Sequence, residues 1–367
     1  MTDTAHTLRR DVAQVIDRWS AGALVTAPEI DALFLRLFRF QVAHIAPYAA
    51  LCASRGVDPG AVTHWQHIPF APADLWKLLP IATAEATTKP AVTFETSGTT
   101  SGAPGRAYLA DTDLYHRAAR AAFGPFVASA AERATLRWLN LVPNPTVRPH
   151  SSLGHMVADL CGDAPCVAWL LDAEMRPDVA AFADHCGHAA ANQVPVLVTA
   201  TSVALQTVLT ALPADWSVAL PPGSRLMDTG GPKGRNLDVD RNAQRAELQR
   251  RLGLPAHAIV GEFGMTELAS QRYEPVWRDA GAAGRTYCAP PWLRSRVCRV
   301  QVGAPPVVAC EPGEVGLVAH LDLANVDTCA FIQTGDLGAL DAQGNLTLHG
   351  RLPGAELRGC GLDVAGG

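Results

Sequence analysis

The stretch LRWLNLV, Leu136–Val142, is a short apolar run, and the amphipathic segment VAAFADHCGH, Val179–His188, follows it along the chain. The alternation continues with the apolar run Val194–Val198, the amphipathic segment Val239–Leu252 and the apolar pair Ile259–Val260. Short apolar runs that alternate with amphipathic segments are typical of buried strands connected by helices, and sheets built in this way are mostly parallel. We therefore expect an α/β fold with a largely parallel sheet.

Patterns of two other kinds flank this region. From Ile30 to Gly56, apolar residues recur at intervals of three and four, which predicts helix. Beyond Pro290, the segments RSRVCRVQV, EVGLVAHLDL and GNLTLHG predict a β-rich subdomain. The expected parts of the chain are a helical segment over 1–90, an α/β core over 91–289, the β-rich subdomain over 290–350 and a hinge-like tail over 351–367.

The composition limits the class of protein. Hydrophobic residues make up 48% of the 367 residues and charged residues 18%, so a sizeable core is possible and global disorder is excluded. The net charge is −5 and Lys and Arg form no stripe, which argues against nucleic acid and anionic membranes as partners. No run approaches the ~18 apolar residues of a membrane span, and the N-terminus lacks the apolar run of a signal peptide. The nine cysteines follow no framework spacing, so we expect reduced thiols in the cytoplasm.

The strongest local motif is TFETSGTTSGAPGR, Thr93–Arg106. Its glycines allow successive backbone N–H groups to converge on an anion, and its hydroxyl groups add further hydrogen-bond donors. The motif predicts a phosphate-binding loop, but not a Walker loop, because no Gly-Lys-Ser/Thr ending follows. A flexible surface loop rich in Ser, Thr and Gly is the alternative interpretation.

Two further motifs follow, and their order is informative. GEFGMTEL, Gly261–Leu268, comes after an apolar run, and QTGDLG, Gln333–Gly338, is followed by HGR, His349–Arg351. Together with the candidate phosphate loop, they resemble the adenylate-forming superfamily of acyl-CoA synthetases, peptide-synthetase adenylation domains and luciferases. More narrowly, MDTGGPKGR, Met227–Arg235, and GRLPGAELRGCGLDV, Gly350–Val364, resemble the acyl-protein synthetase of bacterial bioluminescence, the LuxE type.

The resemblance implies a fold and an activity. The fold is the N-terminal domain of an adenylate-forming enzyme, with parallel α/β layers and a C-terminal β subdomain. The mobile C-terminal domain and its catalytic lysine are expected to be absent or vestigial. The implied activity is the activation of a hydrophobic or fatty carboxylic acid as acyl-adenylate, with ATP and Mg²⁺ as cofactors. The acyl group then passes to an enzyme cysteine and a partner protein, such as an acyl reductase or an acyl-carrier protein.

Two alternatives remain open for the function. One is a ligase that delivers the acyl group to coenzyme A, a carrier protein or an amine. The other belongs to a different class and is a non-catalytic nucleotide-binding subunit.

The resemblance also assigns roles to single residues. Glu267 is the implied Mg²⁺ ligand, Thr266 donates to the α-phosphate, and Arg106 replaces the lysine that related enzymes have after the loop. The other residues implied to hold the phosphates lie in the loop and are Thr96, Ser97, Gly98, Thr99, Thr100 and Gly102. Those implied to hold the nucleoside are Asp228, Gly230, Gly231, Phe263, Gly264, Asp336 and Arg351.

Two catalytic assignments are less direct. Cys360 matches the cysteine that is acylated in acyl-protein synthetases, and the nearby Arg358 would favour its thiolate. His155 is the implied catalytic histidine near the reacting carboxylate, with His150 as its competitor. Each has a structural alternative, namely a small buried cysteine and a hydrogen-bonded structural histidine. Likewise, Phe263 could be ordinary core, and the motifs around Asp228 and Asp336 could be strand-ending turns.

Overall fold

The computed structural model describes residues 4–96, 103–162, 164–230, 240–282, 285–299 and 308–352. Two compact units are formed: Met1–Ala121 with Met265–Gln271 and Cys288–Gly367 in the first, and Ala122–Gly264 with Arg272–Tyr287 in the second. The units are interleaved along the chain, and the four consecutive parts expected from the sequence remain a prediction.

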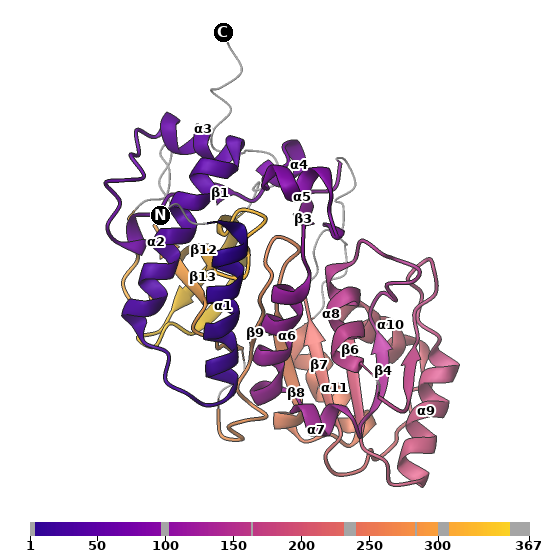
Figure 1. The fold of residues 1–367 in the computed structure, drawn as a ribbon. Coiled ribbons are helices and arrows are strands. Elements are labelled where there is room, and N and C mark those ends of the chain that lie inside the picture. The colour runs from indigo at the N-terminus through magenta and orange to yellow at the C-terminus, as the bar shows by residue number, and fades with distance from the viewer. Residues whose placement is uncertain are drawn as a thin grey trace. The chain divides into compact units, whose positions relative to one another are not determined.

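The second unit is built on a sheet in which the strands lie in the order β5-β4-β6-β7-β8-β9. Figure 1 labels β4, β6, β7 and β8 of this sheet. All neighbouring pairs from β5 to β8 are parallel, and only β9 runs antiparallel to β8. The expected, largely parallel sheet is therefore confirmed. In chain order, the elements of this unit are α7 (Ala130–Arg133), β4 (Arg137–Leu141), α8 (Ser152–Cys161), β5 (Val167–Trp169), α9 (Val179–Ala191), β6 (Val196–Thr201), α10 (Ser202–Ala211), β7 (Arg225–Thr229), α11 (Arg241–Leu252), the 3₁₀ turn η2 (Ala256–Ala258), β8 (Ile259–Phe263), β9 (Arg272–Tyr273) and β10 (Thr286–Tyr287).

The two faces of this sheet are buried by different side chains. Leu139 of β4 shares a core cluster with residues of α9, α10 and α11, such as Phe182 and Leu205. On the other face, the ring of Trp138 stacks on Phe123 at a centroid distance of 6.0 Å. Because successive strand residues point to opposite faces, burial on both faces explains why these strands read as continuous apolar runs.

Polar residues at the helix starts set where the chain turns from strand to helix. Asp178, Thr201 and Asp240 accept hydrogen bonds from backbone N–H groups in the first turns of α9, α10 and α11. Such N-caps satisfy amides that have no partner within the helix and contribute about 1 kcal/mol each.

The first unit combines N-terminal helices with an antiparallel sheet. β14, β13, β12 and β11 lie side by side in this order, and the short β1 pairs in parallel with β13. The expected strands beyond Pro290 are thus confirmed. The elements are α1 (Ala5–Ser20), α2 (Ala27–His44), α3 (Ala46–Ser54), the 3₁₀ turn η1 (Trp65–His67), β1 (Ala71–Pro72), α4 (Leu75–Leu78), α5 (Ala84–Thr88), β2 (Val92–Glu95), β3 (Arg106–Leu109), β11 (Leu293–Cys298), β12 (Gly316–Asp322), β13 (Phe331–Leu340) and β14 (Leu346–Arg351). The helix α6 (Asp113–Phe126) begins in this unit and ends in the second, since the boundary follows Ala121.

The predicted helical stretch from Ile30 to Gly56 contains two helices, because it is interrupted at Ile45. Pro47 lies in the first turn of α3 and has no N–H to continue the hydrogen bonding of α2. The two helices pack on the sheet through aromatic rings: Phe38 and Tyr48 lie 6.0 and 5.9 Å from the ring of Phe331 in β13. Among the described residues, no helix is long and apolar enough to cross a membrane.

Candidate functional site

The base of the candidate phosphate loop is closed by Thr96 and Gly105. The Thr96 N–H donates to the Gly105 carbonyl at 2.9 Å, and the Gly105 N–H donates to the Thr96 hydroxyl oxygen at 2.9 Å. These bonds extend the antiparallel pairing of β2 with β3. The other predicted loop residues, Ser97, Gly98, Thr99, Thr100 and Gly102, lie outside the described residues.

Arg106 begins β3 directly after this loop and pairs with Glu95, which lies opposite it on β2. Its Nε lies 3.0 Å from the Glu95 carboxylate, and this hydrogen bond raises the pKa of Arg106. The guanidinium is half exposed, so a phosphate can approach it but has to compete with Glu95.

Asp336 and Arg351, which the resemblance implies as nucleoside contacts, are brought together by the antiparallel pairing of β13 with β14. They lie directly opposite each other, and the Arg351 Nε is 3.1 Å from an Asp336 carboxylate oxygen. The ion pair orients the carboxylate and leaves its other oxygen to accept hydrogen bonds from hydroxyl groups.

Glu267 lies in the segment Met265–Gln271, which belongs to the first unit. Glu267 is only 7% exposed to solvent. Its backbone carbonyl accepts a hydrogen bond from Asn325 Nδ2 at 2.6 Å. The neighbouring Thr266 is half-buried.

The donor chemistry of Glu267 fits a magnesium ion. Mg²⁺ in proteins is usually held by one or two carboxylates together with substrate phosphates and water. No group of three or more His, Cys, Asp or Glu side chains within the described ranges could hold a metal ion by itself. A single carboxylate therefore suits an ion that arrives with a nucleotide better than a metal cage made by the protein alone.

In the second unit, Asp228 is at the carboxyl end of β7 and is only 1% exposed. Its carboxylate accepts a hydrogen bond from Ser202 Oγ at 2.6 Å and pairs with Arg241 Nη2 at 2.9 Å. Burial opposes the charge of Arg241, but Asp228 and Tyr287 together hold the pKa of Arg241 above its ordinary value. The Asp228 side chain is therefore already committed to protein partners.

Gly230 follows β7 with a φ of +81°, a backbone conformation that favours glycine. Its carbonyl oxygen lies 2.8 Å from Ser202 Oγ and shares the single proton of that hydroxyl with Asp228. The adjacent Gly231 lies outside the described residues. Ser202 thus joins the start of α10 to the end of β7.

The next strand, β8, ends at Phe263, and Gly264 follows it. Phe263 is half-buried, and its ring centroid lies 6.1 Å from that of Tyr287. Glu262, one residue earlier, is buried and accepts a hydrogen bond from the Thr229 hydroxyl.

Sequence reasoning missed Glu262, Ser202 and Arg241. For Glu262 a signal existed, because it is an acidic residue inside an otherwise apolar strand. For Ser202 and Arg241 the sequence carries no such signal, since their importance comes from the contact with Asp228.

His155 lies in the first turns of α8, whose N-cap is Ser151, whereas His150 precedes the helix and is exposed. The helix begins close to Pro143: a Cβ on Gly154 would lie 2.2 Å from the Pro143 carbonyl oxygen. His155 is half-buried and follows the carboxyl end of β4.

The topology of the parallel sheet places these residues at one edge. Asp228 and Gly230 lie at the carboxyl end of β7, and Phe263 and Gly264 lie at the carboxyl end of β8. His155 belongs to α8, the helix that follows β4. The strand that follows β4 in the sequence, β5, lies on one side of it, whereas β7, which follows β6, lies on the opposite side. The strand order therefore reverses between the neighbouring strands β4 and β6, which flank the switch point of the topology. In open α/β sheets, ligands bind outside the carboxyl ends of the strands at such a switch point.

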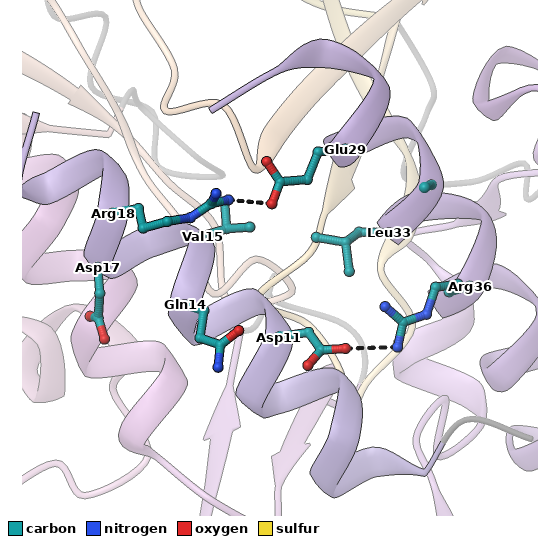
Figure 2. A pocket seen from close by; sticks show the side chains of 9 residues that line it. Asp11, Gln14, Val15, Asp17, Arg18, Glu29, Leu33 and Arg36 are labelled. Atoms are coloured by element: carbon teal, nitrogen blue, oxygen red, sulfur yellow. Dashed lines mark hydrogen bonds and ion pairs between the residues drawn. The ribbon is translucent and has the colours of Figure 1, made fainter. Parts of the chain in front are cut away.

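A separate surface hollow of about 550 Å³ lies between α1 and α2 in the first unit. Figure 2 shows two ion pairs among its lining residues: Arg18 with Glu29, and Asp11 with Arg36 at 2.8 Å. It contains none of the residues that the sequence assigns to the nucleotide.

No protein-family model matches this chain, and no curated protein matches it. Among solved structures, ATP-bound MatB from Rhodopseudomonas palustris is similar, with a TM-score of 0.51 and 16% identity, covering 71% of this chain and 48% of that one. Two ATP-bound RpMatB-BxBclM chimeras, B3 and B1, have TM-scores of 0.51 and 0.50, identities of 16% and 17%, and the same coverage. This chain therefore spans about half the length of these proteins. The likeness confirms the mixed α/β fold that we expected from the sequence.

Proposed function

We propose that this chain activates a carboxylic acid with ATP by forming an acyl-adenylate. The observation that carries this proposal is the position of the implied nucleoside contacts. Asp228 lies at the carboxyl end of β7 and Gly230 follows that strand, while Phe263 ends the neighbouring β8 and Gly264 follows it, although the two pairs are far apart in the sequence. The fold, and the ATP bound to the similar MatB, also support a nucleotide at this edge.

In the proposed reaction, a carboxylate oxygen of the acid attacks the α-phosphorus of ATP. The bond from this phosphorus to the bridging oxygen breaks, and pyrophosphate leaves with the bonding electrons. Thr266 donates its hydroxyl to the α-phosphate, and Arg106 balances negative charge beside the phosphate loop. Asp336, oriented by Arg351, accepts hydrogen bonds from the ribose hydroxyls. Glu267 would hold the Mg²⁺ ion, which would supply charge neutralisation on the phosphates when bound.

The finer proposal concerns the fate of the acyl group. The thiolate of Cys360 attacks the acyl carbonyl, AMP leaves, and the resulting thioester passes its acyl group to a partner protein. The motif around Cys360 supports this route, although the residue lies outside the described part of the chain. The substrate is proposed to be a fatty or other hydrophobic acid. The eight described cysteines are all free, which supports a protein that works in the reducing cytoplasm.

The test is ATP–pyrophosphate exchange with a panel of straight-chain and aromatic acids. Wild type should exchange pyrophosphate only when a suitable acid is present. Glu267→Gln should lower the exchange at least tenfold without changing the melting curve, because it removes a charged metal ligand. Glu174→Gln, an identical change at an exposed pair with Arg176, is the matched control and should exchange like wild type.

The outcomes separate the candidate functions. Binding of ATP without exchange for any acid would favour a non-catalytic nucleotide-binding subunit. Exchange together with acid-dependent release of a coenzyme A thioester would favour a coenzyme A ligase over the acyl-protein route. Normal exchange in Glu267→Gln would remove Glu267 from the metal site.

A further inference from the structure

The connection from β12 to β13, residues 323–330, is buried along its whole length. Connections normally run over the protein surface, because their backbone N–H and C=O groups need water when no protein partner is present. A fully buried connection must therefore obtain its partners from other elements.

One side chain of α2 supplies several of these partners. The Gln41 Nε2 group donates to the carbonyl oxygens of Asn325 at 2.7 Å, Val326 at 3.2 Å and Thr328 at 2.8 Å. Its Oε1 accepts a hydrogen bond from the Ala330 N–H at 2.9 Å. The two hydrogens of Nε2 are shared among these three carbonyl oxygens, so one amide group binds four backbone groups of the connection.

Asp327 anchors the same connection to two other elements of the first unit. It pairs with Arg9 of α1, and its carboxylate accepts a hydrogen bond at 2.9 Å from the Ala110 N–H, just after β3. The connection is therefore a rigid support rather than a loop that adapts to its contacts.

This support faces the segment that carries Glu267. Asn325 Nδ2 donates to the Glu267 carbonyl at 2.6 Å. The carboxylate of Asp322 accepts hydrogen bonds from the N–H groups of Ala269 at 3.0 Å and Ser270 at 2.8 Å, and from Ser270 Oγ at 2.8 Å. Asn325 thus binds the carbonyl of Glu267, and Asp322 binds the amides two and three residues later.

We propose that Asn325, which lies in this support, is a positioning residue that places Glu267 for its magnesium ion. The inference rests on the proposed function, because it takes Glu267 as the metal ligand. Asn325 touches neither metal nor nucleotide in this role, and it acts only through the backbone of Glu267. Without the amide donor, the buried Glu267 carbonyl loses its partner and the segment can shift. Loss of a group that orients a metal ligand typically weakens metal binding by about 10- to 100-fold.

The test is calorimetric titration of the full chain with ATP in excess Mg²⁺, with ATP in EDTA, and with AMP. Asn325→Leu keeps a similar volume but removes the donor. ATP affinity in Mg²⁺ should fall about tenfold, whereas ATP affinity in EDTA and AMP affinity should stay unchanged. Amide exchange in residues 265–271 should become faster in the ligand-free variant, which is a readout independent of the metal.

The matched control is Thr199→Val, which removes a buried hydrogen bond to Asn140 in the second unit. It should show a similar loss of stability but none of the change in Mg²⁺-dependent affinity. If Asn325→Leu does not fold, Asn325→Ser takes its place, since a serine hydroxyl is too short to reach the Glu267 carbonyl, and the same expectation applies.

The failure of the inference and the failure of the proposed function give different results. Wild type that binds no ATP, or binds it equally with Mg²⁺ and EDTA, overturns the assigned function and the inference with it. Wild type that shows the Mg²⁺ effect, with a variant that keeps it in full, overturns the inference alone. A variant that loses AMP affinity as much as ATP affinity also overturns it, because the role of Asn325 would then be generally structural.

Discussion

The buried ion pair of Asp228 with Arg241 allows a quantitative prediction for the substitution Asp228→Asn. The new side chain keeps the shape of aspartate and can still accept from Ser202 Oγ, but it no longer balances the charge of Arg241. Breaking a buried pair by removing one partner typically costs about 3–5 kcal/mol. The Arg241 side chain is 21% exposed, so water relieves part of this cost. We expect the free energy of unfolding to fall by about 2–3 kcal/mol.

A double-mutant cycle isolates the pair from other effects. Arg241→Met should also destabilise the protein, because Asp228 is then left buried without its cation. The double variant should be more stable than the sum of the two single effects predicts, with a coupling energy of about 2 kcal/mol. This follows because removing both charges leaves neither one buried alone.

The assay is urea unfolding followed by tryptophan fluorescence. Asp279→Asn is the control, since Asp279 is 54% exposed and forms a salt bridge with the adjacent Arg278 at 2.7 Å. An exposed pair contributes little, and the control should stay within about 0.5 kcal/mol of wild type. A midpoint for Asp228→Asn equal to that of the control, or strictly additive single effects, would refute the structural role that we assign to Asp228.

Three further predictions concern the nucleotide, the acyl group and pH. Asp336→Ala should weaken AMP and ATP binding together by at least tenfold in calorimetry, because both ligands carry the ribose, and unaltered dissociation constants would make Asp336 structural. Cys360→Ala should keep pyrophosphate exchange but lose the acyl-sized mass increment that wild type gains with acid and ATP, whereas Cys166→Ala should keep both; a label that persists in Cys360→Ala would exclude the acyl-protein route. Burial raises the pKa of Asp322 from 3.8 to about 6 in the folded protein, so its contribution to stability is full below pH 3.8 and is lost as pH rises through about 6. The corresponding fall in unfolding free energy, about 3 kcal/mol, should be absent in Asp322→Asn. An equal dependence of the unfolding free energy on pH in both proteins would contradict the raised pKa of Asp322.

Three strands of the parallel sheet, β4, β6 and β8, could be predicted from the sequence because their signal is local. The apolar runs around β4, β6 and β8 and the amphipathic patterns of α9 and α11 report which faces are buried, and burial follows directly from side-chain hydrophobicity. The order of the motifs likewise indicated a nucleotide site without any knowledge of distances. The resemblance assigns Asp336 and Arg351 to the same ligand, and the structure places them in contact with each other.

The partners of these residues depended on the tertiary structure. Glu267 is hydrogen-bonded to Asn325, which lies 58 positions later in the chain. Asp228 contacts Ser202 and Arg241, which belong to two different helices. No periodicity encodes such contacts, because they arise from strand register and helix packing, which are decided by the sum of many side chains. The motifs therefore predict which residues bind a nucleotide, whereas only the packed structure decided which carboxylates are already held by protein donors and cations.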